Sequence, residues 1–373
     1  MDLHTIKTPS LVLDVERVRR NAETMSARIR SLGASLRPHV KTHKCIEVAR
    51  IQTAGAPPRL TVSTLAEARA FAADGFTDIT YAVPIDPGKF AEAIELSKLC
   101  ERLALITDDT EVPPRLDEDA RRAGVTLDLF LKVDCGYHRC GVEPDRPEAL
   151  EIPRLIDGAR NLRFRGILTH AGHSYHARSS EELLAVARRE RDVMVEFAAS
   201  LRADGIEVPT VSVGSTPTAT HVDHLDGVDE ARPGNYIFFD AFQATLGSCS
   251  FADCALTVLA AVVHRDPVRR KVVLDAGAIA LSKDRGPVEL DPACGFGRVL
   301  DLEGNDLGLR VESVSQEHGA VSVKDESLFD ALRVGARVRV LANHSCLSAA
   351  QHAHYHVLEA GRVVDRWEIQ RGW

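Results

Sequence analysis

The sequence lacks the marks of several large classes of protein. No apolar run approaches the roughly 20 residues of a membrane-spanning helix. The segment Met1 to Ser10 lacks the charged and then apolar profile of a signal peptide. Positive charge is not in excess, because the formal net charge is -8, which argues against a binder of nucleic-acid phosphates. We therefore expect a cytoplasmic protein with neither a nucleic acid nor a membrane as its partner.

Patterned cysteines and a glycine-rich nucleotide loop are missing as well. The 8 cysteines match no spacing of a zinc finger or of a secreted disulfide framework, so we expect reduced thiols. The pairs Cys135/Cys140 and Cys249/Cys254 lack the two-residue gap of structural zinc sites. A doubly wound open sheet is the main alternative to the fold predicted below, but the dinucleotide fingerprint expected after its first strand is absent.

What the sequence does contain is a regular alternation of strand and helix patterns from residue 36 to about residue 232. Glycines follow several of the helical patterns, where a left-handed residue ends a helix. Eight βα units in succession predict a parallel (β/α)8 barrel, an α/β fold. The expected strands are 36–41, 59–64, 79–83, 103–107, 127–134, 164–171, 209–214 and 229–232.

After about residue 245 the helical periodicity fades and short β-prone runs follow one another. We therefore predict two domains: a barrel over residues 15–245, and a mainly β domain over residues 246–373 together with residues 1–14. The strand-like segment Ser10–Asp14 is expected to pair with the β domain. The expected strands of this domain are 255–264, 271–276, 309–314, 337–342, 353–358 and 363–369.

Polar residues end the predicted barrel strands, at the end of the barrel where active sites of this fold lie. The first strand ends in Lys41, in phase with apolar positions, where an ammonium loses hydration and becomes a usable nucleophile. A solvated turn is the ordinary interpretation of a single lysine of this kind. Residues Gly214–Thr218 and Arg232–Tyr236 follow the seventh and eighth strands, where this fold usually binds phosphate. An amine, a phosphate site and an imidazole, His170, together indicate pyridoxal phosphate (PLP).

The run Arg37–Lys44 (RPHVKTHK) resembles the cofactor-lysine motif of the fold-type-III PLP enzymes, in particular the group of D-serine dehydratases and D-threonine aldolases, with alanine racemase as a distant relative. The resemblance covers essentially the whole chain. It implies that Lys41 binds PLP covalently, and that Arg139 lies near the phenolic oxygen of the cofactor. It further implies a homodimer. The other contacts that it implies are a histidine stacked on the ring (His170), a tyrosine (Tyr175), phosphate contacts (Ser215, Thr216, Gly234 and Asn235) and an arginine that faces the pyridine nitrogen in the racemase (Arg232).

A second candidate site lies near the carboxyl end, where His344 and Cys346 are two residues apart. An imidazole and a thiolate suit a borderline-soft ion such as zinc, although another divalent metal could replace it. In the family that the chain resembles, this position is His-x-Cys in dehydratases and His-x-Asp in aldolases. A competing site is formed by alternate histidines of one predicted strand: His352, His354 and His356.

The resemblance implies an enzyme that acts on a D-configured β-hydroxy amino acid. We expect Lys41 to remove the Cα proton as general base, and a metal on His344 and Cys346 to help the hydroxyl leave, so that a 2-oxo acid and ammonia result. D-Serine dehydratase is the main hypothesis. D-Threonine aldolase, D-threo-3-hydroxyaspartate dehydratase, a racemase and a non-catalytic PLP-binding protein involved in cofactor homeostasis are the alternatives. The segments Glu317–Gly319 and Asp275–Gly277 also resemble family segments, and their roles stay open.

Overall fold

The computed structural model describes residues 2–373, which form two compact units. Unit 1 consists of residues 2–22, 42–51 and 235–369. Unit 2 consists of residues 23–41, 52–234 and 370–373, and the chain passes from one unit to the other between Lys41 and Thr42. None of the helices among residues 2–373 is both long enough and apolar enough to span a membrane.

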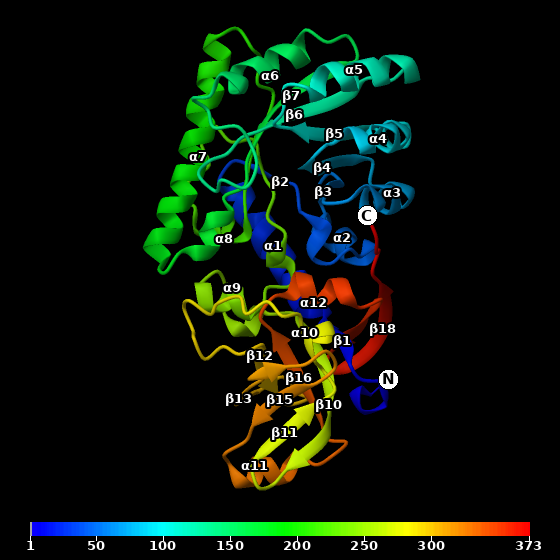
Figure 1. Cartoon of the computed structure of the whole chain (residues 1–373), viewed down its shortest axis with the longest axis vertical. Coiled ribbons are helices and arrows are strands. Elements are labelled where there is room, and N and C mark those ends of the chain that lie inside the picture. The colour runs from blue at the N-terminus through cyan, green and yellow to red at the C-terminus, as the bar shows by residue number, and fades with distance from the viewer. Residues whose placement is uncertain (1) are drawn as a thin grey trace. The chain divides into compact units, whose positions relative to one another are not determined.

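Unit 2 contains a sheet of eight strands in which every neighbouring pair is parallel, as the barrel prediction requires (Figure 1). The last strand in the sequence, β9, lies beside the first, β2, and the strands then follow in descending order from β9 to β3. The predicted barrel fold is therefore confirmed. In spatial order the strands are β2 (Ser35–Leu36), β9 (Glu230–Ala231), β8 (Val211–Val213), β7 (Leu162–Leu168), β6 (Leu127–Lys132), β5 (Arg102–Thr107), β4 (Asp78–Pro84) and β3 (Arg59–Val62).

The segment after β2 differs from the prediction of a strand that runs to Lys41. The strand ends at Leu36, and Val40–Thr42 form a 3-10 helix, η2. Pro38 has no N–H to give to a ladder, but its carbonyl oxygen accepts a hydrogen bond from Thr61 N at 2.9 Å. A single parallel bridge between His39 and Thr61 then links this segment to β3. Lys41 thus follows the barrel wall in a tight turn and does not belong to a strand.

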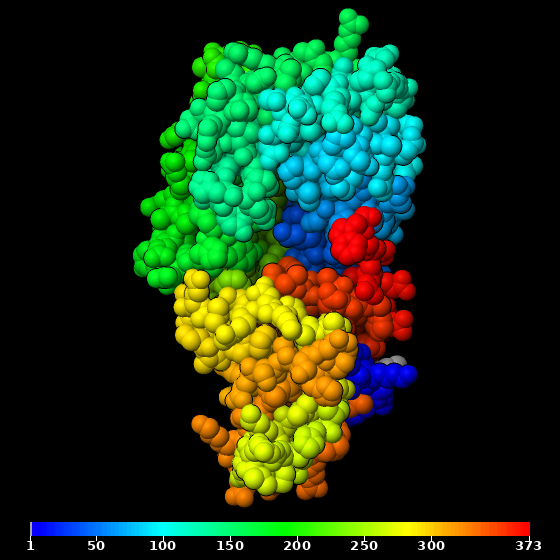
Figure 2. Space-filling view, in the orientation of Figure 1, coloured from blue at the N-terminus to red at the C-terminus, as the bar shows by residue number. Residues whose placement is uncertain are grey.

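Helices connect the barrel strands and cover the outer side of the sheet, and Figure 2 shows α3 to α5 as a continuous blue-to-cyan surface. Helix α7 spans Ser180–Ala203, and the hydroxyl of Ser179 caps it by accepting a hydrogen bond from Glu182 N. The helices before β10 are α1 (Val15–Ser31), α2 (Ile46–Gln52), α3 (Leu65–Ala73), α4 (Phe90–Ser97), α5 (Val112–Ala123), α6 (Pro147–Asp157), α7 (Ser180–Ala203), α8 (Thr216–His221) and α9 (Ala241–Leu246).

The barrel interior is apolar around the strand centres and charged near the strand ends. Four side chains from neighbouring strands pack together there: Ala104, Ile106, Phe130 and Leu168. Lys132 lies two residues after Phe130 on the same strand, so both side chains are on the inner face. The Lys132 side chain is only 4% exposed, so an ammonium group lies directly beside the apolar layer.

Unit 1 is built on a mixed sheet whose central strand comes from the amino end of the chain. β1 pairs antiparallel with β10 and parallel with β17, which confirms the expected role of Ser10–Asp14. The spatial order is β13 (Asp306–Arg310), β12 (Gly297–Leu300), β16 (Arg337–Ala342), β10 (Leu256–Asp266), β1 (Ser10–Asp14), β17 (His354–Glu359) and β18 (Arg362–Glu368), and the branch from β10 contains β11 (Lys271–Leu274), β15 (Gly319–Ser322) and β14 (Ser313–Val314).

Short helices interrupt this mainly β region, where helical periodicity was not expected. Three of them follow β10: α10 (Ala278–Leu281), α11 (Glu326–Ala331) and α12 (Ser345–Gln351). They are too short for an amphipathic repeat to be visible in the sequence. Helix α12 matters for function, because it begins inside the predicted His344/Cys346 site.

Candidate active site

Lys41 is held next to the barrel wall by the backbone of the preceding residues. Arg37 N donates to Ala231 O at 2.9 Å, and His39 N donates to Pro233 O at 3.0 Å. The backbone N–H of Lys41 itself donates to His39 Nδ1 at 3.4 Å. The Lys41 side chain is half-buried, which suits an amine that must stay accessible to a ligand.

His170 lies within electrostatic reach of Lys41, as the predicted site requires. Burial, and then the positive charges of Lys41 and Lys132, lower the pKa of His170 well below its ordinary value. The ring is therefore neutral near pH 7, and its Nδ1–H donates to Gly214 O at 3.2 Å. A neutral, fixed imidazole at the barrel mouth is suited to stacking against an aromatic ring.

The loop after β6 positions Arg139. Asp134 Oδ1 accepts hydrogen bonds from the N–H groups of Gly136 and Tyr137, both at 2.8 Å, which fold the chain into a tight turn. Gly141 closes the loop with a φ of +111°, and a Cβ there would lie 2.7 Å from Asp134 N. The exposed guanidinium of Arg139 lies 5.2 Å from the centre of the Tyr137 ring. The Tyr137 ring in turn contacts His170 edge-on, with 6.2 Å between ring centres.

The loops after β7 and β8 are joined through serine hydroxyls. Ser174 Oγ lies 3.0 Å from Ser215 Oγ, which connects the 3-10 helix η4 (Gly172–His176), and with it Tyr175, to the start of α8. Ser215 is the N-cap of α8 and accepts a hydrogen bond from Thr218 N at 3.3 Å. Ser215 and Thr216 are buried, so the predicted phosphate contacts form a rigid corner of the barrel mouth.

Buried carboxylates, which the sequence analysis did not identify, hold these loops in place. Glu190 Oε1, on α7, accepts hydrogen bonds from Ala171 N at 3.0 Å and from Gly214 N at 3.1 Å. One side chain, 2% exposed, therefore fixes the backbone after β7 and β8 at once. Glu190 lies in phase with the apolar positions Leu183, Ala187 and Phe197 of α7, and a carboxylate on such a stripe was the available signal.

A buried charge network crosses the barrel interior. Glu230 accepts hydrogen bonds from Arg37 Nε and Ser212 Oγ, at 2.8 and 2.7 Å. The guanidinium of Arg232 donates to Ser212 Oγ and to the carbonyl of Thr169, so this arginine is already engaged by protein groups. Burial alone would raise the pKa of Glu230, but Arg37 and Arg232 outweigh burial and hold that pKa below its ordinary value.

We expect Glu230→Gln to lower the free energy of unfolding by about 3–5 kcal/mol, because Arg232 loses its strongest carboxylate neighbour and Arg37 keeps only Asp78. Because the pKa of Glu230 is lowered by folding, its stabilisation is present at neutral pH and is lost as the pH falls through the folded-state value. The variant should therefore lose less stability than the unsubstituted protein on acidification. Urea unfolding at two pH values measures both effects. Glu118→Gln, in an exposed ion pair with Arg121, is the control and should change little.

Lys132 is a second amine inside the barrel. Burial, followed by the charge of Arg232, lowers the pKa of Lys132 to about 8. Glu230 interacts with both Arg37 and Arg232, and Glu190 holds the loops, which leaves the buried Lys132 as a cation for a ligand. Such a site favours an anionic ligand.

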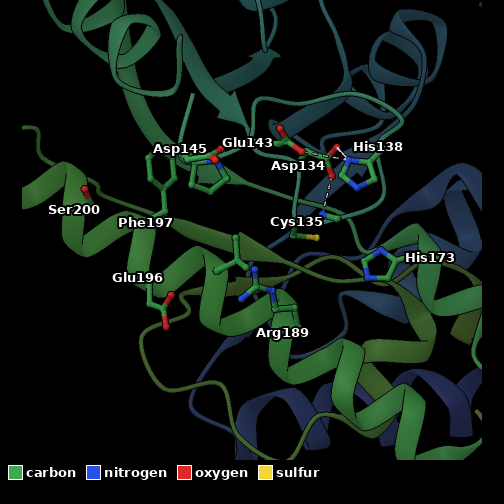
Figure 3. A pocket seen from close by; sticks show the side chains of 13 residues that line it. Asp134, Cys135, His138, Glu143, Asp145, His173, Arg189, Glu196, Phe197 and Ser200 are labelled. Carbon is green, nitrogen blue, oxygen red and sulfur yellow. Dashed lines mark hydrogen bonds and ion pairs between the residues drawn. The ribbon is translucent and has the colours of Figure 1, made fainter. Parts of the chain in front are cut away.

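A separate cavity of about 790 Å³ opens between the loop after β6 and helix α7 (Figure 3). Its lining includes four carboxylates, and Figure 3 shows one of them, Asp134, bonded to His138. None of the predicted cofactor residues lines it. An acidic cavity would repel a phosphate, so it is not the cofactor site. The lining acidic residues are Asp134, Glu143, Asp145 and Glu196.

In unit 1, the predicted metal pair lies at the junction of β16 and α12. His344 Nδ1 is 2.6 Å from Asp284 Oδ2, and the His344 side chain is also hydrogen-bonded to the side chain of Cys346. Burial would lower the pKa of His344, but Asp284 and Cys346 raise it to about 11. Burial would raise the pKa of Cys346, but His344 and Thr42 lower it. The two side chains are therefore a coupled imidazole and sulfur pair, in which each favours the charged form of the other.

The start of α12 is fixed by a buried carboxylate. Asp240 Oδ2 accepts hydrogen bonds from Ser345 N at 2.9 Å and from Asn235 Nδ2 at 2.7 Å. Asn235 Nδ2 also lies 3.1 Å from Ser345 Oγ and 3.5 Å from Cys346 Sγ. The side-chain amide nitrogen of Asn235 is therefore used inside unit 1. Gly234, which precedes it, is buried at the end of the loop after β9.

The competing three-histidine metal site is not formed. His354 and His356 are neighbours on β17, with 5.0 Å between ring centres. His352 lies outside the strand, and its Nε2 is 3.3 Å from Ala280 O. Across residues 2–373 there is no group of three or more His, Cys, Asp and Glu side chains arranged to hold a metal ion. A metal on His344 and Cys346 would need its remaining ligands from water or substrate.

The chain matches two known protein families. Residues 13–241 match the family described as "Alanine racemase, N-terminal domain", and residues 255–358 match the one described as "Putative serine dehydratase domain". A D-threo-3-hydroxyaspartate dehydratase of Delftia sp. (strain HT23) is 40% identical, with 100% of this chain and 99% of the relative covered. A D-serine dehydratase of Dictyostelium discoideum is 34% identical, with 100% and 98% covered. The chain belongs to the PLP-dependent, fold-type-III family of D-serine dehydratases.

Solved structures of similar proteins have the same fold as this chain. The hydroxyaspartate dehydratase of Delftia sp. HT23 superposes with a TM-score of 0.96 at 40% identity, and each chain covers 100% of the other. A D-threonine aldolase from Filomicrobium marinum gives 0.85 at 29% identity, with 99% of this chain and 96% of the other covered. An alanine racemase of Clostridium difficile shares the fold at 15% identity and a TM-score of 0.69. The D-serine dehydratase family is thus a family of lyases built on the racemase fold.

The residues of unit 2 fit the PLP of this family. Lys41 supplies an accessible amine and His170 a neutral ring, and the buried amine of Lys132 suits a phosphate-bearing, anionic cofactor. The donor set of unit 1 likewise fits a divalent metal. In metal sites the nitrogen of a histidine that does not bind metal usually bonds to a carboxylate, as His344 does to Asp284.

Proposed function

We propose that this protein is a PLP- and metal-dependent D-serine dehydratase, which converts a D-configured β-hydroxy amino acid into a 2-oxo acid and ammonia. The observation that carries the proposal is the imidazole–thiolate pair of His344 and Cys346, backed by Asp284. A racemase or a simple PLP carrier has no task for such a pair. A thiolate ligand also favours the dehydratases over the aldolases, if the His-x-Cys and His-x-Asp distinction of the family holds for this chain.

Solved relatives support the metal assignment. Two structures of the hydroxyaspartate dehydratase carry an alanine in place of a cysteine and of a histidine, two positions apart, and the cysteine variant is described as metal-free. His344 and Cys346 have the same spacing. We extend that role to this chain and expect zinc as the usual ion, because sulfur and imidazole ligands suit it.

The residues of the chain have distinct tasks in this reaction. The chemistry that PLP supplies is an electron sink for the charge left on Cα, and that of the metal is Lewis acidity at the β-hydroxyl oxygen. Lys41 holds the cofactor and then takes the Cα proton on its Nζ. His170 stays neutral because its pKa is lowered, and its imidazole would stack against the ring of the cofactor and hold it in place. Overall, D-serine gives pyruvate and ammonia, and the water lost in elimination is regained in hydrolysis.

Two substrates deserve direct comparison. The relative at 40% identity acts on D-threo-3-hydroxyaspartate, according to its name. That compound has a second carboxylate, for which the buried amine of Lys132 is a candidate partner. D-threo-3-Hydroxyaspartate is therefore the second candidate substrate, with the same elimination chemistry.

A product assay tests the proposal. We expect the holoenzyme with D-serine to form pyruvate and ammonia in equal amounts, and with D-threonine to form a 2-oxo acid, without glycine. L-Serine is the control and should not react. Glycine and an aldehyde as products would instead identify an aldolase, and conversion of D-serine into L-serine would identify a racemase. A protein that binds PLP and turns over none of these substrates would be a cofactor carrier.

We further propose that the protein is a homodimer in the cytoplasm. Light scattering on the purified holoenzyme measures the oligomeric state, and cell fractionation measures the location. A monomer with full activity would remove the dimer from the proposal and leave the reaction unchanged.

A further inference from the structure

The sulfur of Cys346 has polar neighbours besides His344. Within unit 1, Cys346 Sγ lies 3.2 Å from Thr42 Oγ1 and 3.5 Å from Asn235 Nδ2. Both neighbours carry protons that a thiolate can accept. Hydrogen bonds to an ionised acceptor are stronger than neutral ones, so these contacts gain strength when Cys346 is deprotonated.

The orientation of Asn235 is fixed by its other partners. Its amide nitrogen also lies 2.7 Å from Asp240 Oδ2, and a carboxylate accepts only from an N–H group. The amide therefore cannot flip to present its oxygen to Asp240 or to the sulfur. Its Oδ1 atom, although buried, has no hydrogen-bond partner among residues 2–373. Burying an amide oxygen without a hydrogen bond costs free energy, so the hydrogen bonds of the Asn235 amide N–H groups must outweigh that cost.

The position of Thr42 is equally constrained. It is 1% exposed and ends the 3-10 helix η2. The next residue, His43, is anchored in unit 1, because its carbonyl oxygen accepts a hydrogen bond from Tyr355 Oη at 2.7 Å. A valine of similar size would fill the same space, so packing does not require the hydroxyl. When Cys346 is a thiolate, the Thr42 hydroxyl stabilises it by donating a hydrogen bond.

We propose that Thr42 and Asn235 are positioning residues of the metal centre, which donate hydrogen bonds to the Cys346 thiolate and so set its strength as a ligand. This inference rests on the proposed metal role of His344 and Cys346. Partners of metal ligands orient them and tune the metal, and their loss usually costs 10–100-fold in metal affinity or activity. Thr42 directly follows Lys41 in the sequence, so the same turn that carries the cofactor lysine also supplies a partner of the metal ligand.

The test uses cobalt, because a thiolate bound to Co²⁺ gives a charge-transfer band. We expect Thr42→Val to move this band to longer wavelength in the difference spectrum between cobalt-loaded and metal-free holoenzyme, because a sulfur that accepts one hydrogen bond fewer gives up its electrons more easily. Zinc affinity should nevertheless fall about tenfold, because the sulfur also loses the contact that orients it toward the metal. Thr42→Ser keeps the hydroxyl and is the matched control, with the band unshifted. The visible band of PLP is followed in each variant to check the cofactor site.

The outcomes separate the inference from the proposed function. If the unsubstituted protein shows no sulfur-to-cobalt band, the metal assignment itself is wrong. If that band is present and Thr42→Val leaves both it and zinc affinity unchanged, the role of Thr42 is wrong and the metal assignment stands. Should Thr42→Val not fold, cadmium-loaded, unsubstituted holoenzyme gives the answer by NMR. Coupling between the spin-active cadmium isotope and the Asn235 amide or Thr42 hydroxyl protons supports the inference, and its absence from both groups overturns it.

Discussion

Lys41→Ala should abolish the visible absorbance of the bound cofactor and lower dehydratase activity by at least about 10⁴-fold, because the chain loses both its covalent anchor and its Cα base. Borohydride reduction of the unsubstituted holoenzyme, followed by peptide mass mapping, should place the cofactor on Lys41. Lys44→Gln removes a lysine three positions away and is the matched control, with absorbance and activity retained.

A cofactor band that survives in Lys41→Ala would refute the assignment of this lysine. The mapping then becomes informative, because Lys132 is the other amine inside the barrel and its pKa is lowered to about 8. A label on Lys132 would move the chemistry to β6, four places from β2 in the order of the sheet, but would keep it inside the barrel. A label on neither lysine would argue against PLP as a covalently bound cofactor.

Cys346→Ala should remove the metal and lower the rate of β-elimination about 10³-fold, because Lewis-acid help to a poor leaving group is lost. Exchange of the Cα proton of D-alanine in heavy water should persist, since that step needs Lys41 and has no hydroxyl to remove. A chelator should have the same effect on the unsubstituted holoenzyme, and added zinc should restore only that protein. Metal analysis and the two rates are measured side by side.

The control for this variant is Cys100→Ala, which changes another partly exposed cysteine, remote in sequence from α12. It should keep metal and activity. Full metal content and full elimination rate in Cys346→Ala would contradict the metal assignment. Loss of both elimination and proton exchange would instead show that Cys346 supports the cofactor site as a whole.

The barrel could be predicted from the sequence because each strand and the helix after it are local and carry their own signals. The prediction failed at Arg37–Lys41, where pairing is non-local: Pro38 interrupts the ladder, and single residues bond to Ala231, Pro233 and Thr61. A strand that exists only through distant partners leaves no period in the sequence. The strands β12 and β15 were missed for another reason, because each is only four residues long and begins with a glycine.

The candidate site likewise contains residues with a local signal in the sequence and residues that act only through distant partners. The residues at strand ends, such as Lys41 and His170, could be named from the sequence because their type and place in the βα pattern are visible. The carboxylates that hold the site could not, because Asp284 and Asp240 act on His344 and Ser345 from far along the chain. Glu190 is the exception, since a charged residue on an apolar helix stripe was visible.

The pairing of β1 has a consequence for synthesis on the ribosome. β1 lies between β10 and β17, so this inner strand is synthesised before the barrel, whereas both of its neighbours are synthesised after the barrel. Its two edges must wait unpaired while the barrel segments emerge and fold. We infer that nascent chains stalled before β10 are exposed to aggregation at Ser10–Asp14, so chaperone demand should fall once β10 and β17 are free to pair with this strand.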